Sequence, residues 1–312
     1  MRWTKRGHIF APDPQNWMHA YAQVPTPLVL PDRLRVFFGC RPKLAEGALP
    51  VSQIAFVDLD RADPGRIIGM AERPVLPLGE LGTFDEFGLH PVSIVERDGA
   101  VWLYYVGWTR MVSVPFNRGI GLAISTDNGQ SFTRYGRGPV VGPTVNEPYL
   151  QQGPVVKRYG DTWHMWYLSG IDWLDDGGRK ECVYQLMHAT SDDGIDWRRD
   201  GRTCLPLHEP TECHAGQGII ERDGVFHMWF SFRHALDFRN AERGYRIGYA
   251  WSDDLETWHR DDTKAAIDVS PEGWDSEMVC YPNILELDGR TLMFYCGNYF
   301  GRDGFGYAEL EE

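Results

Sequence analysis

The chain has 312 residues, of which 43% are hydrophobic and 24% charged, and its formal net charge is −13. This acidic balance argues against nucleic acid or an anionic membrane as a partner, because binding phosphate groups requires a basic face. No window is long and apolar enough to span a membrane, and the opening stretch MRWTKRGHIF lacks the apolar core of a signal peptide.

The first predicted element is a strand that contains WTKRG (3–7), which resembles WRRDG at 197–201. A hairpin pattern follows near residue 30, in TPLVLPDRLRVFFGCRP, and recurs four times along the chain. Each copy has a short apolar strand, a tight turn and an aromatic strand, which is the pattern of a β-hairpin. The turns of the four later copies contain Gly99, Gly160, Gly224 and Gly289.

A second pattern follows three of these hairpins, in GLAISTDNGQSFTR, MHATSDDGIDWRRD and GYAWSDDLETWHRD. It predicts two further strands, so that each repeat forms a four-stranded blade. Five repeats predict an all-β fold, a five-bladed β-propeller. We expect residues 1–312 to form a single domain around one channel. The N-terminal strand is expected to complete the last blade and leave no open sheet edge.

Polar residues recur where the innermost strand of each blade begins and where the second strand ends. These positions lie side by side in a hairpin, so they share one face of the propeller and predict a channel pocket. The alternative is that they satisfy backbone groups along a solvated channel. The candidate substrate-binding residues are Gln23, Gln151, Gln152, His214, Gln217 and Tyr281 at the strand starts, and Arg41, Arg110, Asp172 and Arg233 at the second-strand ends.

The blade count and the turns STDNGQSF and TSDDGIDW resemble the five-bladed glycoside hydrolases of families 32, 43, 68 and 130. The family 43-like enzymes carry three catalytic acids, one on the innermost strand of each of the first three blades. The corresponding stretches are AQVPTPLVL, GLHPVSIV and LQQGPVV, which offer Gln23, His90 and Gln152. The usual acidic triad is therefore not matched, and the resemblance implies glycosidase-like chemistry with non-standard catalytic residues.

Carboxylates recur a few residues before the innermost strands. They are Glu86, Glu147, Glu212 and Glu277, accompanied by Asp85 and Asp275. Glycosidic cleavage needs one carboxyl group to protonate the leaving oxygen and another to activate water or attack the sugar. Glu147 or Glu212 is the predicted proton donor. Glu277 or Asp275 is the predicted base or nucleophile, with His90 orienting one of these groups. The alternative is that each carboxylate holds its own loop or pairs with an arginine.

The sequence thus predicts a glycoside-hydrolase-like protein that acts on a small soluble sugar or glycoconjugate in the channel. The three arginines at matching blade positions favour an anionic ligand. One alternative is a non-catalytic carbohydrate-binding propeller. Another is a metal-dependent enzyme that uses glutamate with His19, His90 and His214.

No cofactor is required by any motif in the chain, although a divalent metal stays open. The six cysteines form no C-x-x-C pair and are interpreted as reduced thiols. The expected location is therefore the cytoplasm.

Overall fold

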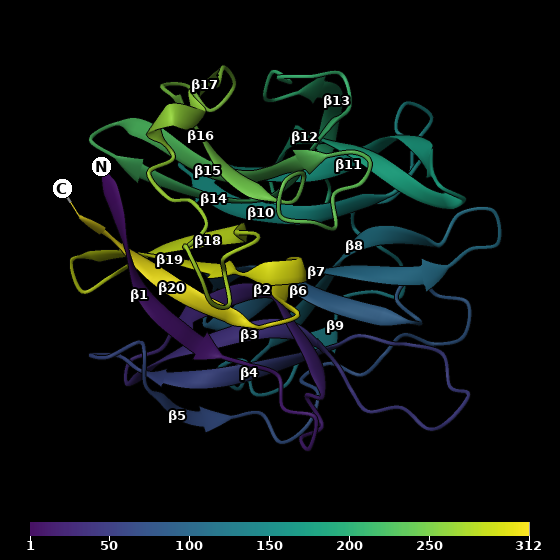
Figure 1. Cartoon of the computed structure of the whole chain (residues 1–312), viewed down its shortest axis with the longest axis horizontal. Helices are drawn as coiled ribbons and strands as arrows, with labels where there is room; N and C mark the ends of the chain where they lie inside the picture. The colour runs from purple at the N-terminus through teal and green to yellow at the C-terminus, as the bar shows by residue number, and fades with distance from the viewer. Residues whose placement is uncertain (312) are drawn as a thin grey trace.

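The protein is a five-bladed propeller, as the repeats predict. The computed structural model describes residues 1–311, which form five four-stranded antiparallel sheets around a common centre (Figure 1). Blade 1 comprises β2 (Ala20–Val29), β3 (Arg33–Arg41), β4 (Gln53–Asp60) and β5 (Ile67–Met70). Blade 2 comprises β6 (Gly88–Arg97), β7 (Ala100–Arg110), β8 (Phe116–Ser125) and β9 (Thr133–Arg134). Blade 3 comprises β10 (Gln151–Tyr159), β11 (Thr162–Asp176), β12 (Arg179–Ser191) and β13 (Arg198–Thr203).

The last two blades follow the same order from the channel outward. Blade 4 comprises β14 (Glu212–Arg222), β15 (Val225–His234), β16 (Arg246–Ser252) and β17 (His259–Arg260). Blade 5 comprises β18 (Cys280–Leu287), β19 (Arg290–Cys296), β20 (Phe305–Glu311) and β1 (Arg2–Phe10). Helical turns among the described residues are short, namely η1 (Asp262–Lys264) and α1 (Asn298–Gly301).

The ring closes through the N-terminal strand. β1 pairs antiparallel with β20, with Trp3 opposite Leu310 and Phe10 opposite Phe305. β1 is therefore the outermost strand of blade 5, which confirms the predicted closure and pairs the edge of β20.

The hairpin turns explain the recurring glycines. Asp98 and Gly99 have φ of 52° and 77°, and Asp288 and Gly289 have φ of 50° and 77°. Positive φ at both central residues is the signature of a type I′ turn, whose twist matches that of the flanking strands. The sequence Asp-Gly thus specifies these hairpins locally.

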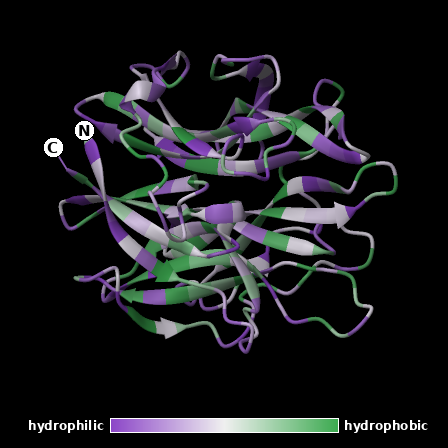
Figure 2. Ribbon diagram, viewed as in Figure 1, coloured by the Kyte–Doolittle hydropathy of each residue, from purple (hydrophilic) through white to green (hydrophobic). Residues whose placement is uncertain are grey.

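The core lies between the blades. The second strands have a neighbour on each edge, and their aromatic side chains fill the space between adjacent sheets. Phe37, Trp166, Phe230 and Phe294 are fully buried in this way. Figure 2 shows hydrophobic and hydrophilic residues interleaved along the strands. No helix among residues 1–311 is long and apolar enough to cross a membrane.

The strand register brings the predicted site positions together. Ala20 lies opposite Arg41, Gly88 opposite Trp108, and Gln151 opposite Ser169. The beginning of each innermost strand therefore lies beside the end of the second strand. We call this end of the channel the mouth.

Candidate functional site

His90 and two arginines form a cationic part of the mouth. The His90 ring packs against Gly39, where an added Cβ would lie 2.4 Å from its Nδ1 atom. Burial, followed by the positive charges of Arg118 and Arg41, lowers the pKa of His90 to about 3. His90 is therefore neutral at physiological pH.

Both of these arginines lack a carboxylate partner within the described residues. The Arg41 guanidinium stacks 4.2 Å from the centre of the Tyr21 ring. Arg118 donates from Nη1 to the Oε1 atom of Gln152, while its buried Nε atom has no partner. Two unpaired guanidinium groups beside a neutral imidazole favour an anionic ligand.

Arg118 was not among the residues predicted from the sequence. It lies near the start of β8, opposite Trp108 at the end of β7. Because the third strand begins beside the end of the second, its first residues also reach the mouth. The stretch NRGIGLA could have indicated this position if the third strands had been searched in the same way.

Aromatic residues form the other side of the mouth. The Tyr281 and Phe300 rings lie 5.6 Å and 5.5 Å from the Tyr245 ring. Gln23 donates from Nε2 to the carbonyl of Phe300 at 3.0 Å, which joins blade 1 to α1. The yellow coil of α1 lies near the centre of the ring in Figure 1.

The backbone is strained in the same region. Tyr21, Val24, Tyr281 and Phe300 have φ between 57° and 61°. This left-handed conformation is unfavourable for residues with a Cβ atom, and most of all for the β-branched valine. Strained residues cluster at functional sites, where the surrounding structure holds them in place. The strain therefore supports a ligand site at the mouth.

The carboxylates that precede the innermost strands are mostly held by their own blades. In blade 2, Asp85 accepts hydrogen bonds from Tyr105 at 2.9 Å and Arg134 at 2.7 Å. In blade 5, Asp275 accepts from Tyr295 at 2.9 Å and Lys5 at 2.7 Å. We call this arrangement of an acid before the innermost strand and a base on the outermost strand the acid clasp.

Blade 3 repeats the acid clasp with Glu147. Its two carboxylate oxygens lie 2.9 and 3.0 Å from the Tyr167 hydroxyl, and Arg199 forms an ion pair at 3.5 Å. Arg199 also donates to the carbonyl of Gly142 at 2.9 Å, which fixes the loop before β10. The partners of Glu147 thus tie it to its own blade.

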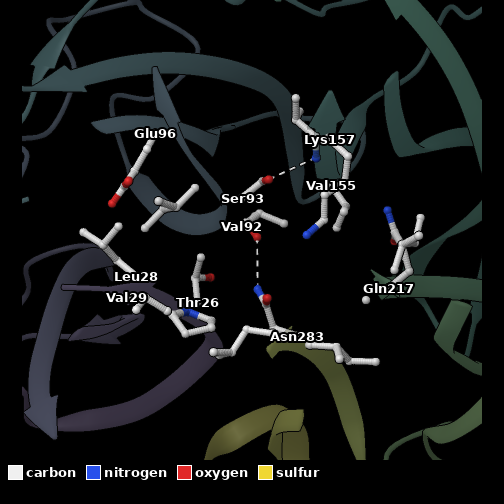
Figure 3. Close-up of a pocket in the computed structure, with 17 residues that line it drawn as sticks. Thr26, Leu28, Val29, Val92, Ser93, Glu96, Val155, Lys157, Gln217 and Asn283 are labelled. Carbon is white, nitrogen blue, oxygen red and sulfur yellow. Dashed lines mark hydrogen bonds between the residues drawn. The ribbon is translucent and has the colours of Figure 1, made fainter. Parts of the chain in front are cut away.

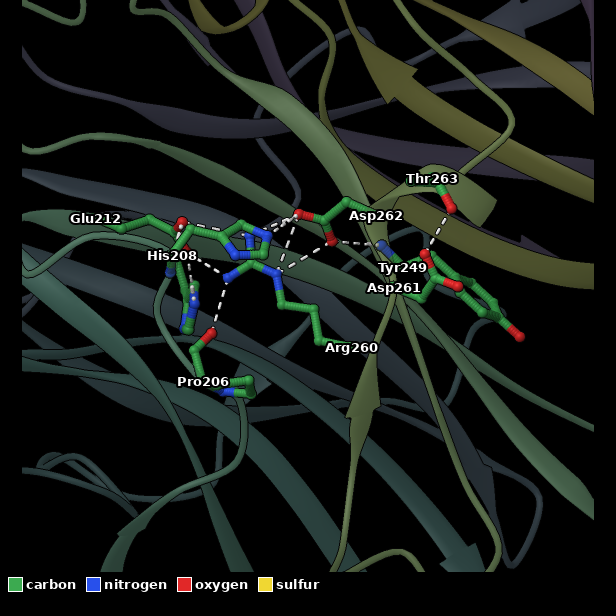
Figure 4. Close-up of polar contacts among 9 residues, drawn as sticks. Pro206, His208, Glu212, Tyr249, Arg260, Asp261, Asp262 and Thr263 are labelled. Carbon is green, nitrogen blue, oxygen red and sulfur yellow. Dashed lines mark hydrogen bonds and ion pairs between the residues drawn. The ribbon is translucent and has the colours of Figure 1, made fainter.

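Blade 4 has a denser version of the acid clasp (Figure 4). Arg260 donates to Glu212 at 2.6 Å and to Asp262 at 2.7 Å, and His214 lies 3.1 Å from Glu212. Burial alone would raise the pKa of Glu212, but the hydrogen bonds from His214 and Arg260 outweigh it and lower the pKa to about 2. An ionised carboxylate of this kind is a poor proton donor at neutral pH.

The acid clasps correct the predicted register of the carboxylates. The equivalent residues are Asp85, Glu147, Glu212 and Asp275. Glu86 instead accepts a hydrogen bond from the Gly82 amide in its own loop at 2.9 Å. Glu277 is half-buried, and its carboxylate makes no hydrogen bond or ion pair within residues 1–311. Its amide donates to Asn298 at 2.7 Å, beside α1.

Several other predicted residues have structural partners. Gln151 donates to the Glu147 and Tyr149 carbonyls at 3.3 and 3.2 Å. Arg233 donates to Tyr245 and to the carbonyls of residues 182, 234 and 235. Arg110 donates to the Pro50 carbonyl at 2.5 Å, and the exposed Asp172 accepts from the Trp173 amide at 2.7 Å. Gln217 lies further along the channel.

The three histidines of the metal alternative have separate environments. His19 lies 2.8 Å from the Pro14 carbonyl through its Nδ1 atom. His214 accepts the Leu186 amide hydrogen at Nδ1 and faces Glu212 through Nε2, so both of its nitrogens are occupied. Among residues 1–311, no group of three or more His, Cys, Asp or Glu side chains is arranged to hold a metal ion.

Comparison with known proteins reveals two full-length relatives and a shared fold. The chain is 35% identical over 314 residues to the uncharacterized proteins Rv1502 and MT1551 of Mycobacterium tuberculosis, covering 100% of each. No protein-family model matches the chain.

Solved structures of glycoside hydrolases have the same architecture. One glycoside hydrolase aligns with a TM-score of 0.76 at 17% identity, covering 99% of this chain and 91% of the other. A complex of BT0996 with RGII gives a TM-score of 0.75 at the same identity and coverage. A GH130-family structure, from a family of mannoside phosphorylases that contains glycoside hydrolases, gives 0.68 at 13% identity, covering 99% and 93%. These likenesses confirm the predicted resemblance at the level of the fold.

Proposed function

Because the chain belongs to the family of the Mycobacterium tuberculosis proteins Rv1502 and MT1551 and has the glycoside-hydrolase propeller fold, we propose that it is a carbohydrate-active protein whose ligand site is the channel mouth. The ligand is a small anionic sugar or glycoconjugate. The observation that carries this proposal is the pair of arginines beside His90, neither of which has a carboxylate partner among the described residues. Tyr281 and Phe300 supply the aromatic surface on which a sugar ring can stack.

The anionic preference can be tested by titration calorimetry with glucose 6-phosphate, glucuronate and glucose. We expect the two anions to bind at least about tenfold more tightly than glucose, because each gains charge-assisted hydrogen bonds. Arg41→Met and Arg118→Met should each weaken anion binding by about tenfold.

Arg137→Met is the matched control, because Arg137 is exposed and pairs with Glu80 outside the mouth. Equal affinities for the neutral and anionic sugars, or equal losses in all three variants, would remove the anionic assignment.

We further propose that the site cleaves a glycosidic bond, with Glu277 as the acid–base residue. Glu277 is the member of the glutamate set whose carboxylate has no partner within residues 1–311. Loss of a general acid or base typically lowers the rate by 10²- to 10⁴-fold. Glu277→Gln should therefore abolish most of any turnover of 4-methylumbelliferyl glycosides and glucuronides, whereas Glu86→Gln should leave the rate nearly unchanged.

A second candidate function is non-catalytic binding of the same ligand. It is favoured by the acid clasps, since Glu147, Glu212 and Asp275 all have basic partners. Tight binding of an anionic sugar without turnover, or full turnover in Glu277→Gln, would favour this alternative over the proposed chemistry.

A further inference from the structure

A cavity of about 340 Å³ lies at the opposite end of the channel from the mouth. It is lined by all five innermost strands, at residues that follow the mouth positions toward the hairpin turns. Figure 3 shows side chains from these strands surrounding the space. The volume lies in the range of small-molecule sites. We call this space the lower cavity.

The inner end of the lower cavity carries polar groups with unused hydrogen-bonding capacity. Gln217 is 2% exposed and donates from Nε2 to the carbonyls of Gly153 and Trp166 at 3.1 and 2.7 Å. Its Oε1 atom is buried and has no partner in the structure. Ser93 accepts the Val156 amide hydrogen at 3.0 Å, which leaves its hydroxyl hydrogen free to donate. An unpaired buried acceptor is costly, so this position calls for a hydrogen-bond donor.

Lys157 provides the charge of the lower cavity. Its side chain is half-buried, and its ammonium group makes no hydrogen bond or ion pair within residues 1–311. Burial lowers the pKa of Lys157, and the more distant Glu286 carboxylate opposes this shift. Glu96 also lines the cavity but is exposed, so water satisfies it. The ammonium group is thus the ion with most to gain from a counter-charge.

The spacing between these groups suits a monosaccharide. Gln217 bonds to the carbonyl of Trp166, which pairs with Val155 on β10. Lys157 lies two residues further along β10, which corresponds to about 7 Å of extended strand. The wall between them is apolar and includes Leu28, Ile94 and Ile284.

We propose that the lower cavity is a second ligand site, separate from the mouth, and that it binds a small sugar acid. The carboxylate would pair with Lys157, a hydroxyl would donate to Gln217 Oε1, and the ring would rest on the apolar wall. Other hydroxyl groups would meet Ser93 and Glu96. This site does not depend on the function proposed for the mouth.

The proposal is tested by titrating D-gluconate and D-glucose into an Arg41→Met/Arg118→Met protein, whose mouth is disabled. We expect gluconate to bind at least about tenfold more tightly than glucose. Adding Lys157→Met should weaken gluconate binding by about tenfold. Adding Lys264→Met should not, because Lys264 is exposed on η1 and pairs with Asp261.

A second measurement uses the wild-type protein and therefore does not depend on any variant folding. Gluconate, but not glucose, should slow acetylation of Lys157 by acetic anhydride, with Lys264 as the internal reference in peptide mass spectrometry. Equal reactivity of Lys157 with and without gluconate, or equal gluconate affinity in the Lys157→Met and Lys264→Met proteins, would overturn the proposal. Loss of binding only when the mouth arginines are changed would assign the ligand to the mouth instead.

Discussion

Single residues decide which carboxylates are available for chemistry. Glu212 and Glu277 occupy comparable loops before an innermost strand, yet their surroundings differ. Glu212 is buried between Arg260 and His214, whereas the carboxylate of Glu277 has no partner within residues 1–311. The first arrangement stabilises an ion, and the second leaves a group free to exchange a proton. The role of each residue thus follows from its neighbours and not from its side-chain type.

The ion pairs of Glu212 make stability depend on pH. The pKa of Glu212 is about 2 in the folded protein, below its ordinary value of 4.5. Its contribution is therefore present above about pH 4.5 and is lost as the pH falls toward 2. We expect Glu212→Gln to lower the free energy of unfolding by about 3 kcal/mol at pH 7, because Arg260 loses a buried partner. The gap to the wild type should narrow in acid.

Urea denaturation at a series of pH values measures this effect. Glu242→Gln is the matched control, since Glu242 is exposed. A loss in Glu212→Gln that stays constant from pH 7 to pH 3 would show that the ion pairs are not its source.

At the scale of strands and turns, the sequence predicted what is encoded locally. Each Asp-Gly turn and each aromatic second strand carries its own signal, so the hairpins were placed correctly. The acid clasps were not, because Asp85 and Glu86 are adjacent and only the loop conformation decides which one turns inward. A one-residue change of this kind reverses the side-chain direction in extended chain.

A signal for the acid clasps was nevertheless present on the outermost strands. In each, an aromatic residue is followed two positions later by a base, as in Trp3 and Lys5 or Phe132 and Arg134. The same spacing recurs in WRR (197–199) and WHR (258–260). These bases point to the acids only when both hairpins of a blade are considered together. The ligand groups of the mouth lack such a repeat, because each blade contributes a different residue.

At the scale of the whole molecule, the charge of the mouth differs from that of the protein. The net charge is −13, yet Arg41 and Arg118 lie beside His90 without acidic partners among the described residues. Exposed charges further away than about 8 Å are largely screened at physiological salt. The local arginines therefore outweigh the distant acids, and an acidic protein can still favour an anionic ligand at its mouth.

Closure of the ring depends on the acid clasp of blade 5, which joins residues far apart in the sequence. Lys5 on β1 donates to Asp275 at 2.7 Å, and Trp3 packs edge-on against Trp229 at 5.2 Å between blades 5 and 4. We expect Lys5→Met to lower the free energy of unfolding by about 2 kcal/mol, because buried Asp275 would keep only its bond from Tyr295. Arg6→Met on the same strand should cost less than about 0.5 kcal/mol, since its pairs with Glu309 and Glu311 are exposed. Chemical denaturation compares the two variants, and equal losses would mean that closure rests on strand pairing alone.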